Sequence, residues 1–250
     1  MSGHSRWSTI KRKKGVADAR KGKIFTKLIK EITVAARIGG GDPNSNARLR
    51  TAVTAARQQN MPGDNVDRAI KKGTGELEGV HYEEFTYEGY GPAGTALLVD
   101  VMTDNKQRTI SEIRHIFTRH NGNLGETGCV AWNFETKGLL ALSKDSINEE
   151  KLMELALESG ADDVREIGNN FEITTDPRKF ENVKKKLEDA KLNFIVSEIA
   201  KLPKSPVQIE GKQAEQMIKL VEALEDNDDV QHVYTNSDIP DEVMEKLGGT

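Results

Sequence analysis

The chain has 250 residues, of which 30% are charged, and its formal net charge is −4. It has one cysteine, Cys129, which excludes an intrachain disulfide and a zinc site built on several cysteines and favours a reducing, cytoplasmic environment. No apolar run approaches the roughly 18 residues that a membrane-spanning helix needs, and no signal-like apolar segment follows the start. The length allows two or three domains.

Positive and negative charges are segregated along the chain. Residues 1–75 contain 17 Lys and Arg against 5 Asp and Glu, whereas the remaining residues contain 19 against 35. The first part therefore has a net charge of +12 and the second a net charge of −16. A basic module joined to an acidic body favours contact with a nucleic acid at the basic end.

The first thirty residues are the centre of this basic module. Residues 11–14 form an unbroken run of Lys and Arg, and residues 1–14 show no apolar periodicity, so we expect a flexible cationic arm. Such an arm binds a polyanion by releasing the counterions condensed on its phosphates. Trp7 lies within the arm and can stack on an unpaired base.

Three helices are predicted next, and together they form a small basic bundle. The first covers residues 17–38, and Lys23, Lys27 and Lys30 lie off its apolar stripe, which predicts that they face solvent. The second is expected to start with Asp42 as N-cap, and the third to end at Gly73. Together, the arm and the three helices provide the candidate nucleic-acid-binding residues: Arg6, Trp7, Lys11, Arg12, Lys13, Lys14, Arg20, Lys21, Lys23, Lys27, Lys30, Arg48, Arg50, Arg57, Arg68, Lys71 and Lys72.

The rest of the chain predicts two α+β units. Strands are expected at 85–88, 95–102 and 130–134, with a helix at about 106–120. Residues 138–200 then follow the order βαββαβ, which is the ferredoxin-like pattern, and its first helix is expected to start in a capping box of Ser146 and Glu149. The helix and strand at 214–234 need a sheet to join. We therefore expect three domains: 1–75, 76–135 with 204–238, and an inserted domain at 136–203.

Catalytic and cofactor motifs are lacking in the sequence, which favours a protein that is not an enzyme. Residues 89–94 match G-x-G-x-x-G, but a strand pattern follows them, so a turn between strands is predicted instead of a dinucleotide site. No arrangement of nucleophile and base is recognisable, and the five histidines show no metal-binding spacing. Cys129 is predicted to be a buried strand residue. We expect no cofactor, no metal and no small-molecule substrate.

Several segments carry a resemblance to a known family. They are residues 3–7, 20–32, 39–43, 46–50, 60–62, 68–75, 87–92, 103–106, 108–109, 111–115 and 123–125. On these segments the chain resembles the YebC/PmpR family across its whole length. The departures are small, with Ala47 where proline is common and Cys129 where serine is common. The resemblance implies a cytosolic, non-enzymatic protein of three domains.

Two functions remain open at this point. The resemblance implies a DNA-binding transcriptional regulator, although no helix-turn-helix is recognisable in the sequence. The alternative is a translation factor that binds ribosomal RNA and assists elongation through difficult sequences such as proline runs, as the resemblance to the mitochondrial translational activator of cytochrome c oxidase implies. The cationic arm and the glycine-rich segment 39–41 suit folded RNA. In either case we expect a monomer that has no contact with a membrane.

Overall fold

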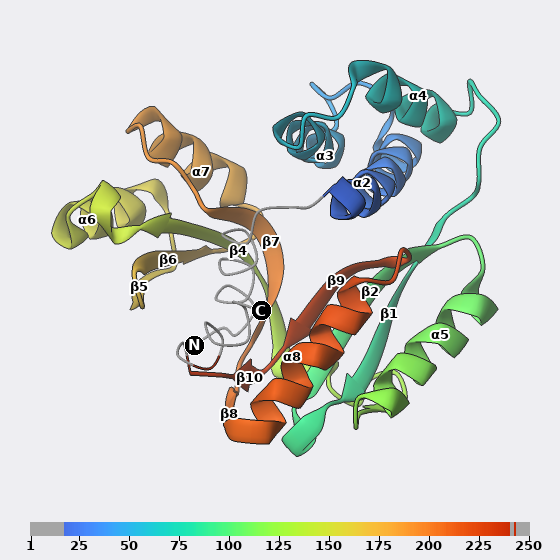
Figure 1. The fold of residues 1–250 in the computed structure, drawn as a ribbon. Helices are drawn as coiled ribbons and strands as arrows, with labels where there is room; N and C mark the ends of the chain where they lie inside the picture. Colours follow the sequence, from blue (N-terminus) through green and yellow to red (C-terminus); the bar gives the residue numbers. More distant parts are fainter. Residues whose placement is uncertain (1–17, 241–242, 244–250) are drawn as a thin grey trace.

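The computed structural model describes residues 18–240 and Val243. A helical bundle comes first, followed by two α+β units (Figure 1). The bundle contains α2 (Asp18–Gly39), α3 (Ala47–Gln58) and α4 (Gly63–Thr74). Its core joins the apolar stripes of all three helices through buried residues that include Ile32, Leu49, Val53, Val66 and Ala69. The helical periodicity of the sequence therefore predicted this core correctly.

The start of α3 differs from the prediction because Asn46, not Asp42, is its N-cap. The Asn46 side chain accepts a hydrogen bond from Leu49 N at 3.0 Å and donates one to Ala35 O, in α2, at 2.8 Å. The Asp42 carboxylate instead accepts from Asn44 N within the preceding turn. Asn46 has both a donor and an acceptor, so it can cap α3 and bond to α2 at once, which a carboxylate cannot do.

The end of α4 was also predicted at the wrong glycine. The helix continues through the buried Gly73 to Thr74, and Gly75 is the C-cap with a φ of 85°. Gly73 has a different role: a Cβ at this position would lie 2.4 Å from Thr33 O and 2.7 Å from Ala36 Cβ. The missing side chain therefore allows α2 and α4 to approach closely.

The first α+β unit is a four-stranded antiparallel sheet with two helices on one face (Figure 1). It contains β1 (Glu83–Tyr90), β2 (Ala96–Thr103), α5 (Lys106–Arg119), β3 (Asn123–Leu124), α8 (Gly211–Glu225) and β9 (Val230–Thr235). The strand order is β3-β1-β2-β9, so the last part of the chain returns to a sheet that began more than a hundred residues earlier. Leu97 and Val99 of β2 pack against Phe117 of α5 and Met217 of α8.

The second α+β unit is inserted into the first, between β3 and α8. It contains β4 (Phe134–Ser143), α6 (Glu149–Ser159), β5 (Asp163–Ile167), β6 (Asn170–Thr175), α7 (Phe180–Asp189) and β7 (Val196–Pro203). All neighbouring strands are antiparallel and their order is β5-β6-β4-β7, as a split βαβ arrangement requires. The predicted class is confirmed: α+β, with a ferredoxin-like βαββαβ unit inserted into another unit.

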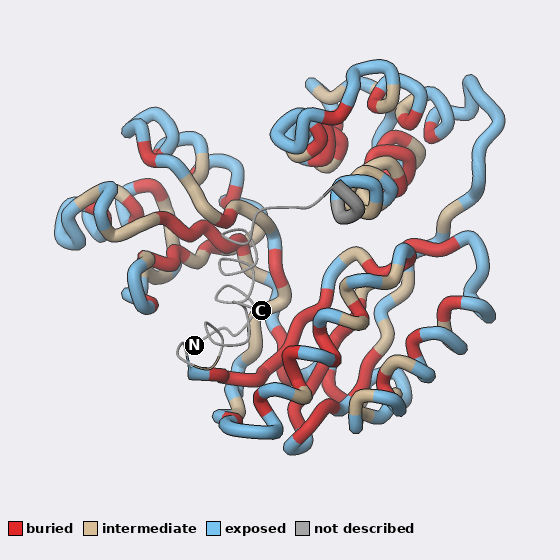
Figure 2. The backbone as a smooth tube through the Cα atoms, in the orientation of Figure 1, coloured by how far each residue is buried: buried red, intermediate tan, exposed pale blue. Residues whose placement is uncertain are grey.

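The two sheets are joined by an apolar contact between faces that carry no helix. Ala96, Leu98 and Tyr234 of the first sheet pack against Leu139 and Val196 of the second. Figure 2 shows buried residues along the central strands and on the inner sides of the helices, while the outer sides of the helices are exposed. The inserted unit is thus attached through its own core strands.

Several local predictions were wrong around residues 129–149. Residues 131–133 form a 3-10 turn instead of a strand, and β4 begins only at Phe134. Cys129 is half-buried and lies outside any strand. Asn148, rather than Ser146, caps α6, and its side chain accepts from Glu150 N at 2.9 Å. The short strands β3, β8 (Val207–Gln208) and β10 (Ser237–Asp238) were missed. The predicted turn at residues 89–94 is confirmed, because it joins the antiparallel strands β1 and β2.

A matched pair of glycine substitutions tests the close approach of α2 and α4. We expect Gly73→Ala to destabilise the protein by about 1–3 kcal/mol, because its Cβ would overlap the backbone of α2. Gly22→Ala is the control, since Gly22 lies in α2 with no atom within 4 Å of its added Cβ, and it should stabilise by about 0.5–1 kcal/mol. Urea unfolding measures both, and equal effects would contradict the assigned role of Gly73.

Candidate nucleic-acid interface

Part of the predicted basic set lies outside the described residues. Arg6, Trp7, Lys11, Arg12, Lys13 and Lys14 belong to this part, and of Arg20 only the backbone, in α2, is described. Their role in nucleic-acid binding therefore stays a prediction from sequence. The remaining predicted residues divide into two groups with different surroundings.

The first group contacts the acidic turn, which we define as residues 225–229, between α8 and β9. Lys23 Nζ lies 2.6 Å from the Asp226 carboxylate and also donates to Asp226 O at 3.1 Å. One helical turn further along α2, Lys27 Nζ donates to Glu225 O at 2.6 Å. These carbonyls end α8, and the C-terminus of a helix favours nearby cations because of the helix dipole.

Lys30 continues this row and is buried, with 6% of its surface exposed. Its Nζ lies 2.6 Å from Asp229 Oδ1 and donates to Asp228 O at 2.9 Å and Met102 O at 3.3 Å. The Tyr82 ring lies 5.5 Å from the same atom. The prediction that Lys30 faces solvent was wrong, and Lys23 and Lys27 are only half exposed. All three attach α2 to the first α+β unit.

Asp229 is the centre of this contact. Besides Lys30, its carboxylate accepts from Arg108 at 2.8 Å and from Thr109 Oγ1 at 2.7 Å. Burial by itself would raise the pKa of Asp229, but the hydrogen bonds from Lys30, Arg108 and Thr109 outweigh it and lower the pKa to about 2. The carboxylate is therefore ionised throughout the physiological range.

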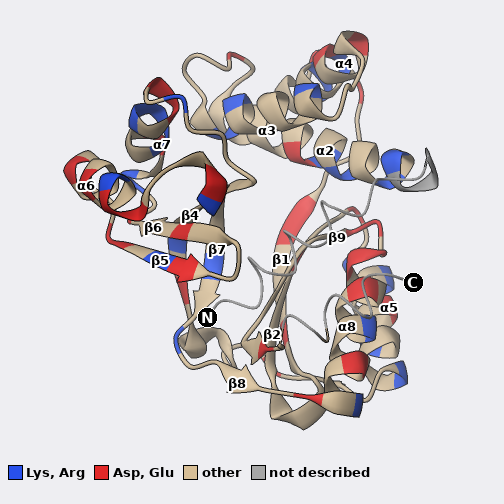
Figure 3. Cartoon of the chain, turned by 60° about the vertical axis from the view of Figure 1, so that its left-hand side comes forward, with Lys and Arg blue, Asp and Glu red and all other residues tan. Residues whose placement is uncertain are grey.

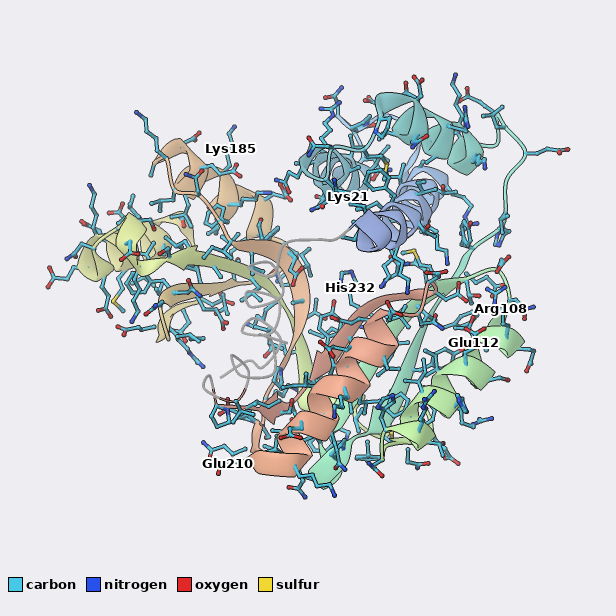
Figure 4. The ribbon with its side chains drawn as sticks, in the orientation of Figure 1. Lys21, Arg108, Glu112, Lys185, Glu210 and His232 are labelled. Carbon is cyan, nitrogen blue, oxygen red and sulfur yellow. The ribbon has the colours of Figure 1, made fainter. Side chains whose placement is uncertain are left out.

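Helix α5 contacts the acidic turn at a second point. Glu112 lies one turn after Arg108 on this helix (Figure 4), and its carboxylate accepts from Asn227 Nδ2 at 2.7 Å. The turn is thus bonded by α2 on one side and by α5 on the other. It connects the bundle to the first α+β unit through polar groups.

Arg48 makes a further connection between the bundle and the sheet. Its guanidinium forms two hydrogen bonds to Glu31, at 2.7 and 3.0 Å, and two to Glu84 of β1, at 2.7 and 3.1 Å. The hydrogen bond to Glu31 is the main reason why the pKa of Arg48 is raised. Arg37 of α2 donates to Tyr82 O, which lies just before β1. These arginines fix the position of the bundle.

The second group of predicted residues is exposed on the bundle. Arg57, at the end of α3, and Arg68, Lys71 and Lys72, on α4, have no carboxylate partner among residues 18–240; we call these four residues the basic surface. Arg68, Lys71 and Lys72 share one face of α4 by their spacing, opposite the packed Val66, Ala69 and Gly73. Figure 3 shows Lys and Arg residues on the helices of the bundle.

Two further cations of the predicted set are exposed on the bundle, one on α3 and one on α2. Arg50 of α3 is exposed and, among the described residues, donates to the carbonyls of Pro43 and Asn44. Lys21 is exposed near the start of α2 (Figure 4). The structure therefore leaves the side of the bundle formed by α3 and α4 available to a polyanion.

The exposure of Trp132, outside the bundle, was not predicted from the sequence. Trp132 lies in the 3-10 turn before β4, and 69% of its surface is exposed. In the sequence this tryptophan follows several small residues, and that pattern does not distinguish an exposed ring from a buried one.

Two other kinds of site are absent from the part of the chain that the structure describes. No helix there has the length and apolarity to span a membrane. No three acidic, histidine or cysteine side chains are grouped there in a way that could bind a metal ion.

The fold and this surface define a protein with a basic helical module on a two-unit α+β body. Residues 5–76 match the TACO1/YebC protein N-terminal domain, and residues 82–237 match the TACO1/YebC second and third domain. The chain therefore belongs to the TACO1/YebC family, which confirms the resemblance found in the sequence.

Named relatives match over nearly the full length. A protein of Geobacter sulfurreducens is 61% identical over 247 residues, which cover 99% of this chain and 100% of that one. One of Syntrophus aciditrophicus is 59% identical over 248 residues, covering 99% of each. Both are named probable transcriptional regulatory proteins. The crystal structure of the conserved hypothetical protein Aq1575 from Aquifex aeolicus has 48% identity and a TM-score of 0.82, covering 91% of this chain and 94% of that one.

A substitution at Asp229 tests the contact that attaches the bundle. Asp229→Asn should lower the free energy of unfolding by about 3–5 kcal/mol at neutral pH, because it leaves Lys30 buried without a countercharge. The pKa of Asp229 is lowered from 3.8 to about 2, so its stabilisation is present above the ordinary pKa and disappears as the pH falls through the folded value.

Urea unfolding at several pH values between about 4 and 2 measures this dependence, and the substituted protein should lose less stability over the range. Asp228→Asn is the matched control, since the exposed Asp228 contacts Lys30 only through its carbonyl. Parallel pH profiles for wild type and Asp229→Asn would contradict the assignment.

Proposed function

We propose that this protein is a nucleic-acid-binding regulatory protein without enzymatic activity, and that it binds the phosphate backbone through the basic surface and the cationic residues 6–14. The observation that carries the proposal is that Arg57, Arg68, Lys71 and Lys72 are exposed on the bundle without a carboxylate partner among the described residues, while the rest of the chain is acidic. Cations in this state can release counterions from a polyanion, whereas Lys30 and Arg48 are already neutralised by carboxylates.

The first candidate function is DNA-binding regulation of transcription in the cytoplasm. The names of the relatives support a regulatory role. The connection between α3 and α4, residues 59–62, has the length found in helix-turn-helix motifs. In this division of the chain, residues 1–75 bind the nucleic acid, and the units 76–135 with 204–238 and 136–203 form the acidic body.

The distribution of charge along α4 favours contacts with phosphates over contacts with base edges. Recognition helices usually direct their N-terminal residues to the bases. Here the first turns of α4 contain Asp64 and Asp67, and the cations Lys71 and Lys72 occupy the last turn. Binding through this helix would therefore depend more on the shape of the nucleic acid than on its sequence.

That same charge distribution supports a second candidate, a translation factor that binds ribosomal RNA. Double-stranded RNA is recognised mainly by shape and by its backbone, which is what the C-terminal half of α4 can offer. The exposed Gly40, which follows α2, has open space where a Cβ would lie and so leaves room for close approach of a backbone. This candidate uses the same basic surface as the first.

Removal of the basic surface tests the proposal. We expect a variant with Arg57, Arg68, Lys71 and Lys72 replaced by Gln to bind duplex DNA and hairpin RNA more weakly, whatever their sequence. The slope of log K against log salt should become shallower by about 0.9 for each phosphate that the variant no longer neutralises. Fluorescence anisotropy over a range of salt concentrations gives both values.

The control variant carries the same charge change elsewhere. It replaces Lys151, Lys185, Lys191 and Lys212 by Gln, four exposed lysines of the α+β units without a carboxylate partner among the described residues. Its salt slope should equal that of the wild type. If the two variants lost affinity equally, binding through the bundle would be contradicted.

A cross-linking experiment separates the two candidates. The protein is cross-linked in cells, and the attached DNA and RNA are purified separately and sequenced, with the basic-surface variant in parallel. Peaks at promoter DNA that the variant loses support the first candidate, and reads in ribosomal RNA that the variant loses support the second. Loss of neither class in the variant would count against the basic surface as the binding site.

A further inference from the structure

The loop of residues 125–133, between β3 and β4, is fixed by a buried carboxylate. Glu88 of β1 accepts hydrogen bonds from the backbone N–H groups of Gly128 at 2.6 Å, Val130 at 2.8 Å and Ala131 at 2.8 Å. Burial acts to raise the pKa of Glu88, but these three donors outweigh it and the pKa is lowered. An ionised acceptor bonded three times makes this loop a rigid part of the sheet edge.

The far end of the same loop is fixed by the segment after β7. Asn133 is buried, its side-chain oxygen accepts from Ser205 N at 3.0 Å, and its carbonyl accepts from Lys204 N at 2.8 Å. Ser205 O in turn accepts from Asn236 Nδ2 at 3.0 Å. The loop is therefore bonded directly to β1 and to residues 204–205, and residue 205 is itself bonded to Asn236.

Two exposed aromatic rings are carried by this rigid loop and its neighbour β1. Cys129 O accepts hydrogen bonds from Trp132 Nε1 at 3.0 Å and from Tyr90 OH at 3.1 Å, and the two residues are 69% and 39% exposed. We call these two residues the aromatic platform. Because the polar atom of each ring already has its partner within the protein, only the ring faces remain to interact with a ligand.

We propose that the aromatic platform is a second nucleic-acid contact, which stacks on an unpaired base of single-stranded or looped nucleic acid. Stacking needs only an accessible ring face, and every base provides one. Lys204 is exposed and donates to the backbone carbonyl of Trp132 at 3.2 Å, which places a cation at the same residue to contact a phosphate that adjoins the stacked base. The inference rests on the proposed function, since it assigns a further contact to the same ligand.

A protein partner fits the surroundings of Trp132 less well. The core of a protein interface is a contiguous apolar area in which aromatic residues are joined by aliphatic ones. In the described part of the chain, the exposed large aliphatic residues lie on other elements, namely α2, the segment before β1, α6 and β7: Ile38, Leu77, Val80, Met153, Leu157 and Ile199. The aromatic platform and the neighbouring Lys204 thus provide two rings and a cation, which is the combination that binds single-stranded nucleic acids.

The chain offers a direct test because it has two tryptophans, Trp7 and Trp132. Trp7→Phe leaves Trp132 as the fluorescent reporter of the platform, and Trp132→Phe leaves Trp7 as the reporter of the N-terminal segment. Each full-length variant is titrated with labelled pyrimidine-rich single strands of about 12 nucleotides, as DNA and as RNA, and with a perfect duplex. Anisotropy of the label reports binding, and tryptophan emission reports stacking.

We expect the single strands to quench Trp132 emission in the Trp7→Phe protein, with saturation at the concentration at which anisotropy saturates, and the duplex to leave it unchanged. Trp132→Ala should weaken single-strand binding by roughly 5- to 140-fold, the range for loss of one stacked base. Met153→Ala, which removes an exposed apolar side chain from α6, should leave it unchanged. The DNA and RNA arms show which strand the platform prefers.

The outcomes distinguish this inference from the proposed function. If anisotropy reports binding while Trp132 emission and the affinity of Trp132→Ala stay unchanged, the platform is not a contact and the proposed function stands. If no nucleic acid changes the anisotropy of any variant, the proposed function fails and the inference fails with it. The inference would also be overturned if single strands quenched Trp132 emission in Trp7→Phe but bound Trp132→Ala as tightly as the wild type. The ring would then report a change elsewhere in the protein.

Discussion

The buried ion pair between Lys30 and Asp229 is the interaction on which the arrangement of this protein depends. Transfer of two charges from water into the interior is costly, and such a pair is tolerated only where further hydrogen bonds satisfy both ions. Both ions have such hydrogen bonds here, because Lys30 also donates to two carbonyls and Asp229 also accepts from Arg108 and Thr109. The pair joins residues 199 positions apart in sequence, and so fixes α2 to the turn before β9.

The charge segregation along the sequence consequently has two physical causes. Part of the positive charge of residues 1–75 serves attachment, since Lys23, Lys27 and Lys30 neutralise the acidic turn and the C-terminus of α8. The rest is carried by the basic surface, which has no carboxylate partner among the described residues. A charge count from sequence adds the two together and overstates the cations available to a ligand.

Local patterns were sufficient to predict the elements and their class. Apolar periodicity predicted the helices of the bundle, and counting elements predicted that a βαββαβ unit is inserted into another unit. Errors arose where a distant partner decides the outcome. Lys30 lies off the apolar stripe of α2 but is buried by a turn that follows α8, and Asn46 replaces Asp42 as cap because it also bonds to α2. The exposure of Trp132 likewise depends on Glu88 and Ser205, which are remote in sequence.

Attachment of the bundle by ion pairs has a consequence for the nucleic-acid binding proposed above. The basic surface belongs to the bundle, whereas Tyr90 and Trp132 belong to the first α+β unit and its junction with β4. Because Lys30 and Arg48 fix the bundle to that unit, the two surfaces keep a set separation, and a ligand must present phosphates and an unpaired base at matching positions to use both. A uniform duplex has no unpaired base, so this geometry would favour a structured nucleic acid with an unpaired segment beside a helical one.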